Sequence, residues 1–342
     1  LMIEEPDFDI ILSDINMPEM DGLTLLSRIN ELRNPAQKCI MVSAYGDMKN
    51  IRTAMNRGAF DFATKPIDMD DLSVTIEKAI EEINYIKERQ EEHKQLQALK
   101  NDMEVAAEIQ RAILPCRFPP FPELADKLEI FASMTPAKAV GGDFYDFRID
   151  EQRIGFVIAD VSGKGIPAAL FMAISNPVIR SIALTTDSSN DCLNKANQLL
   201  SRTSVDSMFV TVLYGIFNLE TGEIDFTNAG HNPTYILRKD GEVEKVPQHS
   251  NFVLGAFEDF IFQPDTTHLD HGDSIVLYTD GVTEAFNADE EEFGEKRLHD
   301  TLKGLKQESA EGIIKGILKE KDLFVGETEQ SDDITMLVLK RL

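Results

Sequence analysis

The sequence predicts three consecutive parts: a partial parallel α/β domain, a long helix, and a larger α+β domain rich in strands. Apolar strands alternate with amphipathic helices up to Pro66, which is the pattern of a parallel sheet. Apolar positions three and four residues apart then continue over 71–114 and indicate one long helix. From Lys127 onward, short apolar strands and turn sequences dominate. The expected divisions of the chain are 1–84, 85–117 and 118–342.

The composition is that of a folded protein large enough for two domains. The chain has 342 residues, of which 42% are hydrophobic, and a formal charge of −26. Nucleic acids and anionic membranes bind positive surfaces, so neither is expected as a main partner. No apolar run approaches the about 18 residues of a membrane span, and no secretory signal is evident, so a cytoplasmic location is expected. The three cysteines form no CxxC pair and support no thiolate site.

In the first part, three apolar strands end in polar residues that can do chemistry. Strands are expected at residues 8–14, 38–43 and 60–65, with helices after the first two. In parallel α/β sheets the functional residues lie at the carboxyl ends of the strands. These ends carry Asp14, Ser43 and Lys65.

The motifs SDINMPEMDG, VSAYGD and TKP resemble a response regulator receiver. The resemblance implies that Asp14 is the phosphoacceptor, Ser43 the switch hydroxyl and Lys65 the phosphate-pairing lysine, with Phe62 at the position of the rotating aromatic residue. A receiver also has an earlier strand ending in an acidic pair that helps to hold Mg²⁺. The chain begins after that strand, so it is interpreted as a fragment of a longer protein, with a degenerate receiver as the alternative. As given, it lacks the pair on which phosphorylation of Asp14 depends.

The long helix carries two apolar stripes separated by the polar stretch 88–94. The first stripe consists of Leu72, Ile76, Ile80 and Ile83, and the second, offset from it, of Leu96, Leu99, Met103, Ala106 and Ile113. This spacing predicts a coiled-coil linker and a homodimer formed through it, with a phase break between the stripes. A solvated single helix is the alternative. Pro115 ends the helix, and a proline-rich stretch leads into the third part.

In the third part, apolar strands deliver aspartates at their ends. Residues 139–165 are expected to form a β-hairpin with Asp143 and Asp160 at its two ends, beside glycines that let the backbone approach an ion. A second strand leads to Asp280, and Asp332 and Asp333 precede the last strand. One interpretation is that these acids are ordinary turn residues without a chemical role. Carboxylate-rich sets suit Mg²⁺ or Mn²⁺, and two such ions can activate water and neutralise a phosphoryl group.

GGDFYD, ADVSGKG, NAGHNP, LYTDGVTEA and SDDIT, in this order, resemble the SpoIIE-type branch of metal-dependent (PPM) serine/threonine phosphatases over roughly 118–342. The resemblance implies a β-sandwich flanked by helices and two divalent ions, Mn²⁺ or Mg²⁺. The catalytic metal ligands it implies are Asp143, Asp160, the carbonyl of Val161, Asp280 and Asp332. Relatives carry a histidine, a proposed general acid, shortly after the second aspartate. This chain has Val-Ser-Gly-Lys from Val161 onward, so its general acid is unassigned.

The remaining segments complete the expected α+β pattern. Helices are expected at 167–184, 190–201, 295–305 and 309–318, and hairpins pair 209–217 with 224–228 and 234–237 with 243–246. His231 is interpreted mainly as a loop brace, with a role near the substrate as the alternative. Lys164 is interpreted as a solvated turn residue, with phosphate contact as the alternative.

The expected function is therefore hydrolysis of phosphoserine or phosphothreonine on a partner protein. By resemblance, the substrate is an anti-sigma-factor antagonist or a similar switch protein, and a cognate histidine kinase acts on the receiver if it is complete in the parent protein. The alternative is a catalytically silent phosphatase-fold module controlled by the receiver, against which the intact acids argue. A nucleotide-binding protein is disfavoured, because no GxxxxGK[ST] or GxGxxG follows a strand and opens a helix.

Overall fold

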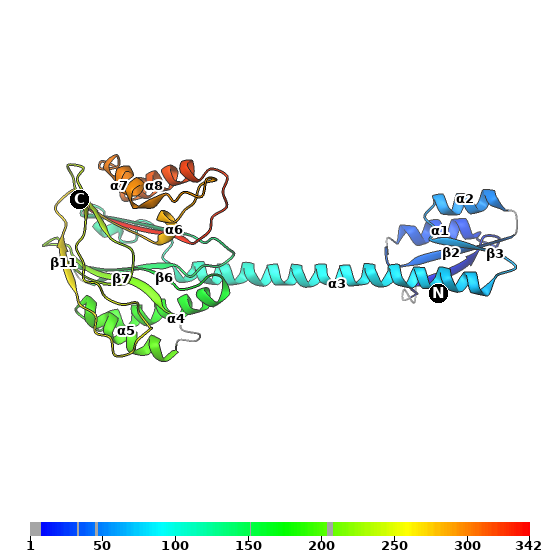
Figure 1. The fold of residues 1–342 in the computed structure, drawn as a ribbon, viewed down its shortest axis with the longest axis horizontal. Helices are drawn as coiled ribbons and strands as arrows, with labels where there is room; N and C mark the ends of the chain where they lie inside the picture. The colour runs from blue at the N-terminus through cyan, green and yellow to red at the C-terminus, as the bar shows by residue number, and fades with distance from the viewer. Residues whose placement is uncertain (1–7, 33, 45–46, 151, 204–207) are drawn as a thin grey trace. The chain divides into compact units, whose positions relative to one another are not determined.

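The computed structural model describes the chain except residues 1–7, 33, 45–46, 151 and 204–207. The chain divides into two compact units, Leu1–Asn101 and Asp102–Leu342, and the division falls within one helix (Figure 1). The finer division at 84/85 and 117/118 stays a prediction. Arg33, and Tyr45 and Gly46 of the VSAYGD motif, lie outside the described residues.

The first unit contains a three-stranded parallel sheet. Its elements are β1 (Ile10–Asp14), α1 (Gly22–Glu31), β2 (Lys38–Ala44), α2 (Met48–Asn56) and β3 (Asp61–Lys65), with strand order β1-β2-β3. Apolar side chains from both helices, among them Leu26 and Ala54, pack with Met41 of β2. The Asp21 side chain begins α1 by accepting the Thr24 N–H at 2.7 Å. The predicted partial α/β sheet is confirmed.

The long helix α3 runs over Met69–Ile113 and has 45 residues. It begins two residues before the expected start and ends one residue before the expected end. Its first turns are part of the first unit, where Leu72, Ala79 and Ile83 are buried and Lys38 pairs with Glu82 at 2.6 Å. Residues 84–109, all of them described, have no buried side chain. The predicted coiled coil therefore concerns a stretch that this chain alone leaves uncovered.

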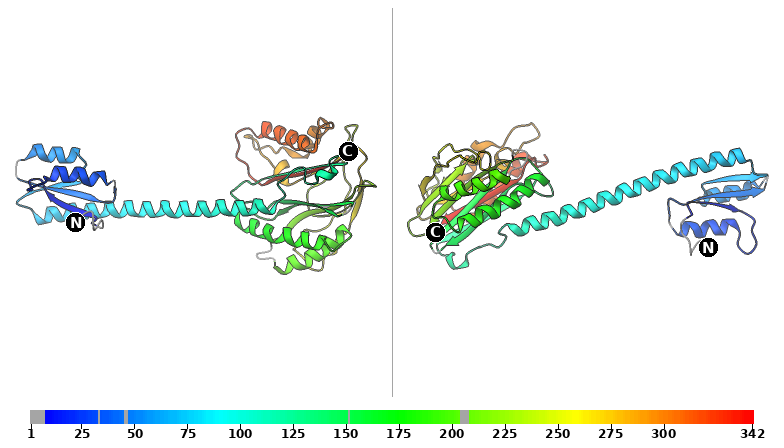
Figure 2. Two further views of the ribbon diagram at one scale, coloured as in Figure 1. Left: turned by 180° about the vertical axis from the view of Figure 1, so that it is seen from behind. Right: turned by 90° about the horizontal axis from the view of Figure 1, so that it is seen from below.

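The second unit is a sandwich of two antiparallel five-stranded sheets flanked by helices (Figure 2). The first sheet has the order β11-β8-β7-β6-β5, and the second has the order β10-β9-β12-β13-β4. The strands are β4 (Leu128–Thr135), β5 (Phe144–Asp150), β6 (Arg153–Val161), β7 (Val210–Asn218), β8 (Glu223–Ala229), β9 (Tyr235–Leu237), β10 (Val243–Lys245), β11 (Asp265–His268), β12 (Ser274–Tyr278) and β13 (Ile334–Arg341). The helices are the 3-10 turn η1 (Pro122–Leu124), α4 (Ile166–Ala183), α5 (Ser189–Thr203), α6 (Asp280–Thr283), α7 (Gly294–Lys303) and α8 (Ala310–Val325).

Strand β13 has buried side chains on both faces, and each face belongs to a different hydrophobic core. Leu337 and Leu339 belong to the core between the two sheets, whereas Met336 and Val338 face a second core under α7 and α8. Successive side chains of a strand point to opposite faces, so a strand covered on both faces is apolar throughout. Helices α4 and α5 cover the outer face of the other sheet (Figure 1). The expected helix-flanked sandwich is confirmed.

No apolar run long enough to span a membrane is expected from the sequence. Helix α4, however, is long and apolar enough, by length and composition alone, to cross one. Its buried side, with Phe171 and Met172, packs in the core, and its other side exposes Ile166, Leu170 and Ile174. The core helix of a globular domain passes the same test, so this composition is weak evidence for a span.

Candidate metal centre

The β5–β6 hairpin brings Asp143 and Asp160 to the same end of the first sheet. The register pairs Phe144 with Ala159, so Asp143, directly before β5, lies opposite Asp160. A Cβ atom at Gly142 would lie only 3.1 Å from the Val161 carbonyl oxygen, which places that carbonyl beside the glycine loop. The hairpin thus gathers three of the predicted ligands.

The second sheet supplies the other two acids through β12 and β13. These strands are antiparallel, with Tyr278 paired to Met336. Asp280 begins α6 two residues after Tyr278, and Asp332 lies two residues before β13. A side chain at Gly281 would collide with the Asp333 carbonyl, so this close approach of α6 requires glycine.

The electrostatics show that the four predicted carboxylates act on one another. Burial raises the pKa of Asp143 well above its ordinary value, and the neighbouring Asp160 raises it further. Burial and then the charge of Asp280 raise the pKa of Asp160 to about 7, with a smaller contribution from Asp332. Burial and Asp332 also raise the pKa of Asp280. Carboxylates carried by both sheets therefore lie near enough to affect one another's ionisation.

Lys164 is the basic group that meets this cluster. Its Nζ atom lies 2.7 Å from Asp332 Oδ2 and donates to the Ser331 carbonyl at 3.0 Å. The hydrogen bond to Asp332 raises the pKa of Lys164, so it remains protonated. The lysine is half-exposed and contacts the edge of the centre, which is more than the solvated turn residue expected from the sequence.

Two residues that the sequence analysis gave no role support the acids. The Thr279 hydroxyl donates to Asp143 Oδ2 at 2.8 Å and accepts the Thr335 N–H at 2.9 Å. The Asp333 carboxylate accepts the N–H groups of Ala137 at 2.8 Å and Gly142 at 2.6 Å. Adjacent aspartates of the SDDIT motif thus have different surroundings, since Asp332 meets Lys164 and Asp333 holds backbone. In the sequence, the position of Thr279 directly before Asp280 in the TDG motif was the only indication of its role.

His231 lies buried in the loop after β8. Its ring Nδ1 atom is 3.0 Å from the Thr211 hydroxyl, and its backbone N–H donates to Asn228 Oδ1 at 2.7 Å. Burial lowers its pKa to about 4, so the ring is neutral at physiological pH. Thr211 pairs with Asp160 across β6 and β7. These contacts are those of a loop brace behind the acidic strand end.

The donor chemistry of the centre fits a hard divalent cation. It consists of carboxylate oxygens with one carbonyl nearby, and the mutual repulsion of the acids is relieved by bound positive charge. Among the described residues, no three Asp, Glu, His or Cys side chains lie close enough together to hold a metal ion. The chemistry of these donors therefore fits a metal, while their spacing is wider than that of a formed shell.

The raised pKa values predict that the metal-free protein loses stability as pH rises. The folded state keeps a proton on Asp160 up to about pH 7, whereas the unfolded chain releases it near 3.8. The stability gained from this proton is complete below the lower value and disappears as pH rises through the higher one. Calorimetry in chelator should show that this proton's contribution to the melting temperature falls between about pH 4 and about pH 7. Asp160→Asn should flatten this slope, and an unchanged slope would contradict the assignment.

The receiver residues lie at the carboxyl ends of the parallel strands, as expected. Lys65 at the end of β3 forms an ion pair with Asp14 at the end of β1, and this contact lowers the pKa of Asp14. Ser43 is buried on β2 between them, and Phe62 is half-buried against the core of this unit. The roles assigned to these four residues stay predictions.

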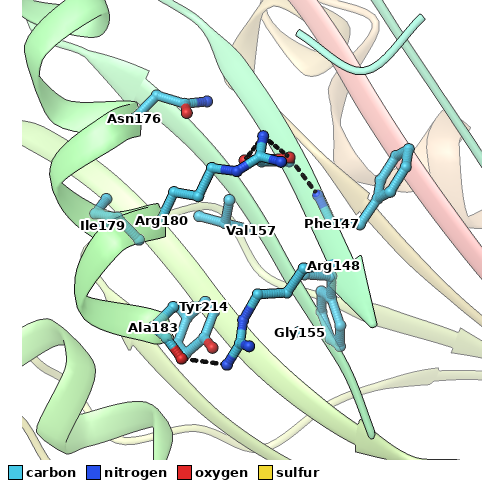
Figure 3. A pocket seen from close by; sticks show the side chains of 11 residues that line it. Phe147, Arg148, Gly155, Val157, Asn176, Ile179, Arg180, Ala183 and Tyr214 are labelled. Carbon is cyan, nitrogen blue, oxygen red and sulfur yellow. Dashed lines mark hydrogen bonds and ion pairs between the residues drawn. The ribbon is translucent and has the colours of Figure 1, made fainter. Parts of the chain in front are cut away.

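A small cavity lies away from the acids, between α4 and the first sheet (Figure 3). Arg180 reaches across it to pair with Asp146 at 3.1 Å, and Arg148 donates to the Ala183 carbonyl. Its volume of about 20 Å³ is near that of one water molecule, so no phosphorylated side chain fits there.

The sandwich, its helical layers and the acids at the meeting strand ends define a protein phosphatase of the PPM class, here joined to a receiver. The Stage II sporulation protein E (SpoIIE) family matches residues 150–342, and the response regulator receiver domain matches residues 1–77. The chain is 32% identical over 249 residues to phosphoserine phosphatase RsbU of Bacillus subtilis, covering 72% of this chain and 71% of RsbU. The receiver part is 40% identical over 78 residues to transcriptional regulatory protein ZraR of Escherichia coli, covering 23% of this chain and 18% of ZraR.

Among solved structures, the SiaA-PP2C domain of Pseudomonas aeruginosa superimposes with a TM-score of 0.62 at 22% identity, covering 72% of this chain and 98% of that domain. This likeness supports the fold. The chain belongs to the SpoIIE family. It is a serine/threonine protein phosphatase of signalling pathways, joined to a response regulator receiver, and its family implies dependence on divalent metal.

Proposed function

We propose that the centre holds two divalent ions, Mn²⁺ or Mg²⁺, through the side chains of four acids and one main-chain carbonyl. These groups are Asp143, Asp160, the carbonyl of Val161, Asp280 and Asp332. The observation that carries the proposal is that carboxylates from both sheets raise one another's pKa at a single point, with Lys164 at its edge. Such a cluster is unfavourable without cations and suited to hard ones.

The reaction is hydrolysis of a phosphoserine or phosphothreonine ester on a protein. Bound metal would supply an activated water and neutralise charge on the phosphoryl group. The chain's own residues fix the donors: Thr279 orients the Asp143 carboxylate, and Asp333 holds the loop at Gly142. Lys164, already beside Asp332, is placed to attract the oxygens of an incoming phosphate.

The substrate is a phosphorylated switch protein of the anti-sigma-factor antagonist kind. The similarity to RsbU, a phosphoserine phosphatase, supports this class. The charge of −26 disfavours nucleic acid and anionic membranes as partners and accords with a cytoplasmic location.

The receiver regulates this activity. A histidine kinase would phosphorylate Asp14 in the parent protein, with Ser43 and Lys65 contacting the phosphoryl group and Phe62 responding to the switch. The uncovered stretch 84–109 of α3 pairs with its copy in a homodimer, which sedimentation equilibrium of the chain measures. A monomer at every concentration would exclude that dimer.

The function is tested by phosphate release from a phosphoserine protein. Release should require Mn²⁺ or Mg²⁺, stop on addition of chelator, and return when metal is restored. A phosphotyrosine protein of similar charge serves as the substrate control and should react far more slowly. Binding of the phosphoserine protein without release, with metal present, would show the catalytically silent module instead.

A further inference from the structure

The side chain of Gln110, near the end of α3, contacts the loop before Asp143. This residue is 8% exposed, and it is the only buried residue between Ile83 and Leu114, a stretch that the structure describes in full. Its helix neighbours Ile109 and Arg111 are exposed. A buried amide is unfavourable unless both its donor and its acceptor find partners.

Gln110 finds both partners in the backbone of Gly141. Its Nε2 atom donates to the Gly141 carbonyl at 2.5 Å, and its Oε1 atom accepts the Gly141 N–H at 3.0 Å. This is the two-bond pattern that residues exchange across antiparallel strands, made here by a side chain. Because one bond goes to the N–H of Gly141 and the other to its carbonyl, the amide fixes the peptide groups on both sides of this residue.

Gly141 is also held on its other side. The next residue, Gly142, donates its N–H to Asp333 Oδ2 at 2.6 Å. A Cβ atom at Gly141 would collide with the Asp333 carboxylate and lie 2.7 Å from Met134 Cε. Confined between Gln110 and Asp333, the loop has little room to adjust by itself. A displacement of Gln110 therefore displaces the backbone that leads into Asp143.

The helix end beside this contact has space around it. A cavity of about 300 Å³ lies there, lined by residues that include Ala107, Gln110, Leu114 and Met134. Just after the helix, the Tyr145 hydroxyl donates to the Pro115 carbonyl at 2.8 Å. The end of α3 is thus held by these polar contacts and by the packing of Ile113 and Leu114 on the core, beside a cavity that leaves the helix room to shift.

We propose that Gln110 is a positioning residue that couples α3 to the metal centre, by setting the Gly141 backbone and through it the Asp143 carboxylate. The inference rests on the proposed role of Asp143 as a metal ligand. It gives the receiver and linker a physical route to the centre: a roll or shift of α3 weakens or strengthens two hydrogen bonds. An ionised glutamate cannot replace this amide, because it has no proton for the Gly141 carbonyl.

The test compares Gln110→Leu and Gln110→Glu with the unaltered full chain. Gln110→Leu should weaken Mn²⁺ binding, measured by calorimetry, by about tenfold, as loss of a support behind a metal ligand does. Hydrogen–deuterium exchange of the peptide containing Gly141 should become faster. The kcat for phosphate release should fall, while the KM for the phosphoprotein should stay within about twofold, because Gln110 does not touch substrate.

Glu108→Gln is the matched control, since Glu108 is exposed on the same helix turn and should leave every measurement unchanged. If Gln110→Leu fails to fold by circular dichroism, Gln110→Glu decides, because it keeps the length and the acceptor for the Gly141 N–H. Unchanged Mn²⁺ affinity and unchanged Gly141 exchange in a folded variant would overturn the inference and leave the proposed function standing. Mn²⁺ binding without phosphate release by the unaltered chain would overturn the proposed function. The Mn²⁺ affinity and the hydrogen exchange of the Gly141 peptide would still test the role of Gln110 in that case. If the unaltered chain binds no Mn²⁺, both fail.

Discussion

Replacing Asp280 by asparagine should lower metal-dependent phosphate release by about 100-fold or more and weaken Mn²⁺ binding. Asp280 begins α6 where the two sheets meet, and its charge acts on Asp160. Asparagine keeps the shape but removes the charge, and a loss of several kcal/mol of charge stabilisation corresponds to a rate loss of about this size. Phosphate release and calorimetric Mn²⁺ titration measure both effects.

The same variant should melt at a higher temperature than the unaltered chain when metal is absent. Its carboxylate is one of several that burial and repulsion drive to raised pKa values, so its neutral replacement relieves repulsion at neutral pH. Asp289→Asn, the same change in an exposed loop, is the control and should alter neither activity nor stability. Full activity in Asp280→Asn would remove Asp280 from the ligand set.

The adjacent acids Asp332 and Asp333 should give opposite results when each is replaced by alanine. Asp333 accepts two backbone N–H groups, so Asp333→Ala leaves the Ala137 and Gly142 amides without that partner. We expect the free energy of unfolding to fall by about 2–3 kcal/mol, the value of hydrogen bonds to a charged acceptor. Asp332→Ala removes a proposed ligand and a partly exposed contact with Lys164, so it should abolish activity with little change in stability.

Chemical denaturation in chelator measures the stability of both variants, and phosphate release in Mn²⁺ measures their activity. Asp333→Asn is a useful intermediate, since its amide oxygen still accepts one N–H. If Asp332→Ala proved the more destabilising change, the roles assigned to the two acids would have to be exchanged.

The sequence predicted the features that depend on local pattern. Acids beside apolar strands located Asp143 directly before β5, Asp160 near the end of β6 and Asp280 shortly after β12, and the expected hairpins and helices of the catalytic unit follow in the expected order. Helix α8 continues to Val325, whereas its expected end is residue 318. The segment after residue 318 is rich in charged residues, but it still packs on the domain, because its Lys321 is buried. A long side chain of this kind covers apolar surface while its end pairs with an acid, here Asp322 at 2.8 Å.

The supporting contacts could not be predicted, because they join residues that are far apart in sequence. Thr279 and Asp143 are 136 positions apart, and Gln110 and Gly141 are 31 apart. Each of these polar residues looks like an ordinary surface residue within its own segment. Gln110 in particular lies in a polar helix whose apolar spacing indicated a coil. The partner of a buried polar group is set by the tertiary fold, which the spacing of side chains along one element does not encode.

The position of β13 in its sheet has a consequence for the order of events during synthesis. The strand lies between β12 and β4 and pairs Arg341 with Leu128, more than 200 positions earlier. While β13 is still within the ribosome, β4 lacks its neighbour and the second sheet cannot close. Long-range strand pairing of this kind forms late. The acidic cluster is therefore completed only after β13 emerges. In the nascent chain its acidic side chains are still separated, so the chain becomes catalytically active only when the second sheet is complete.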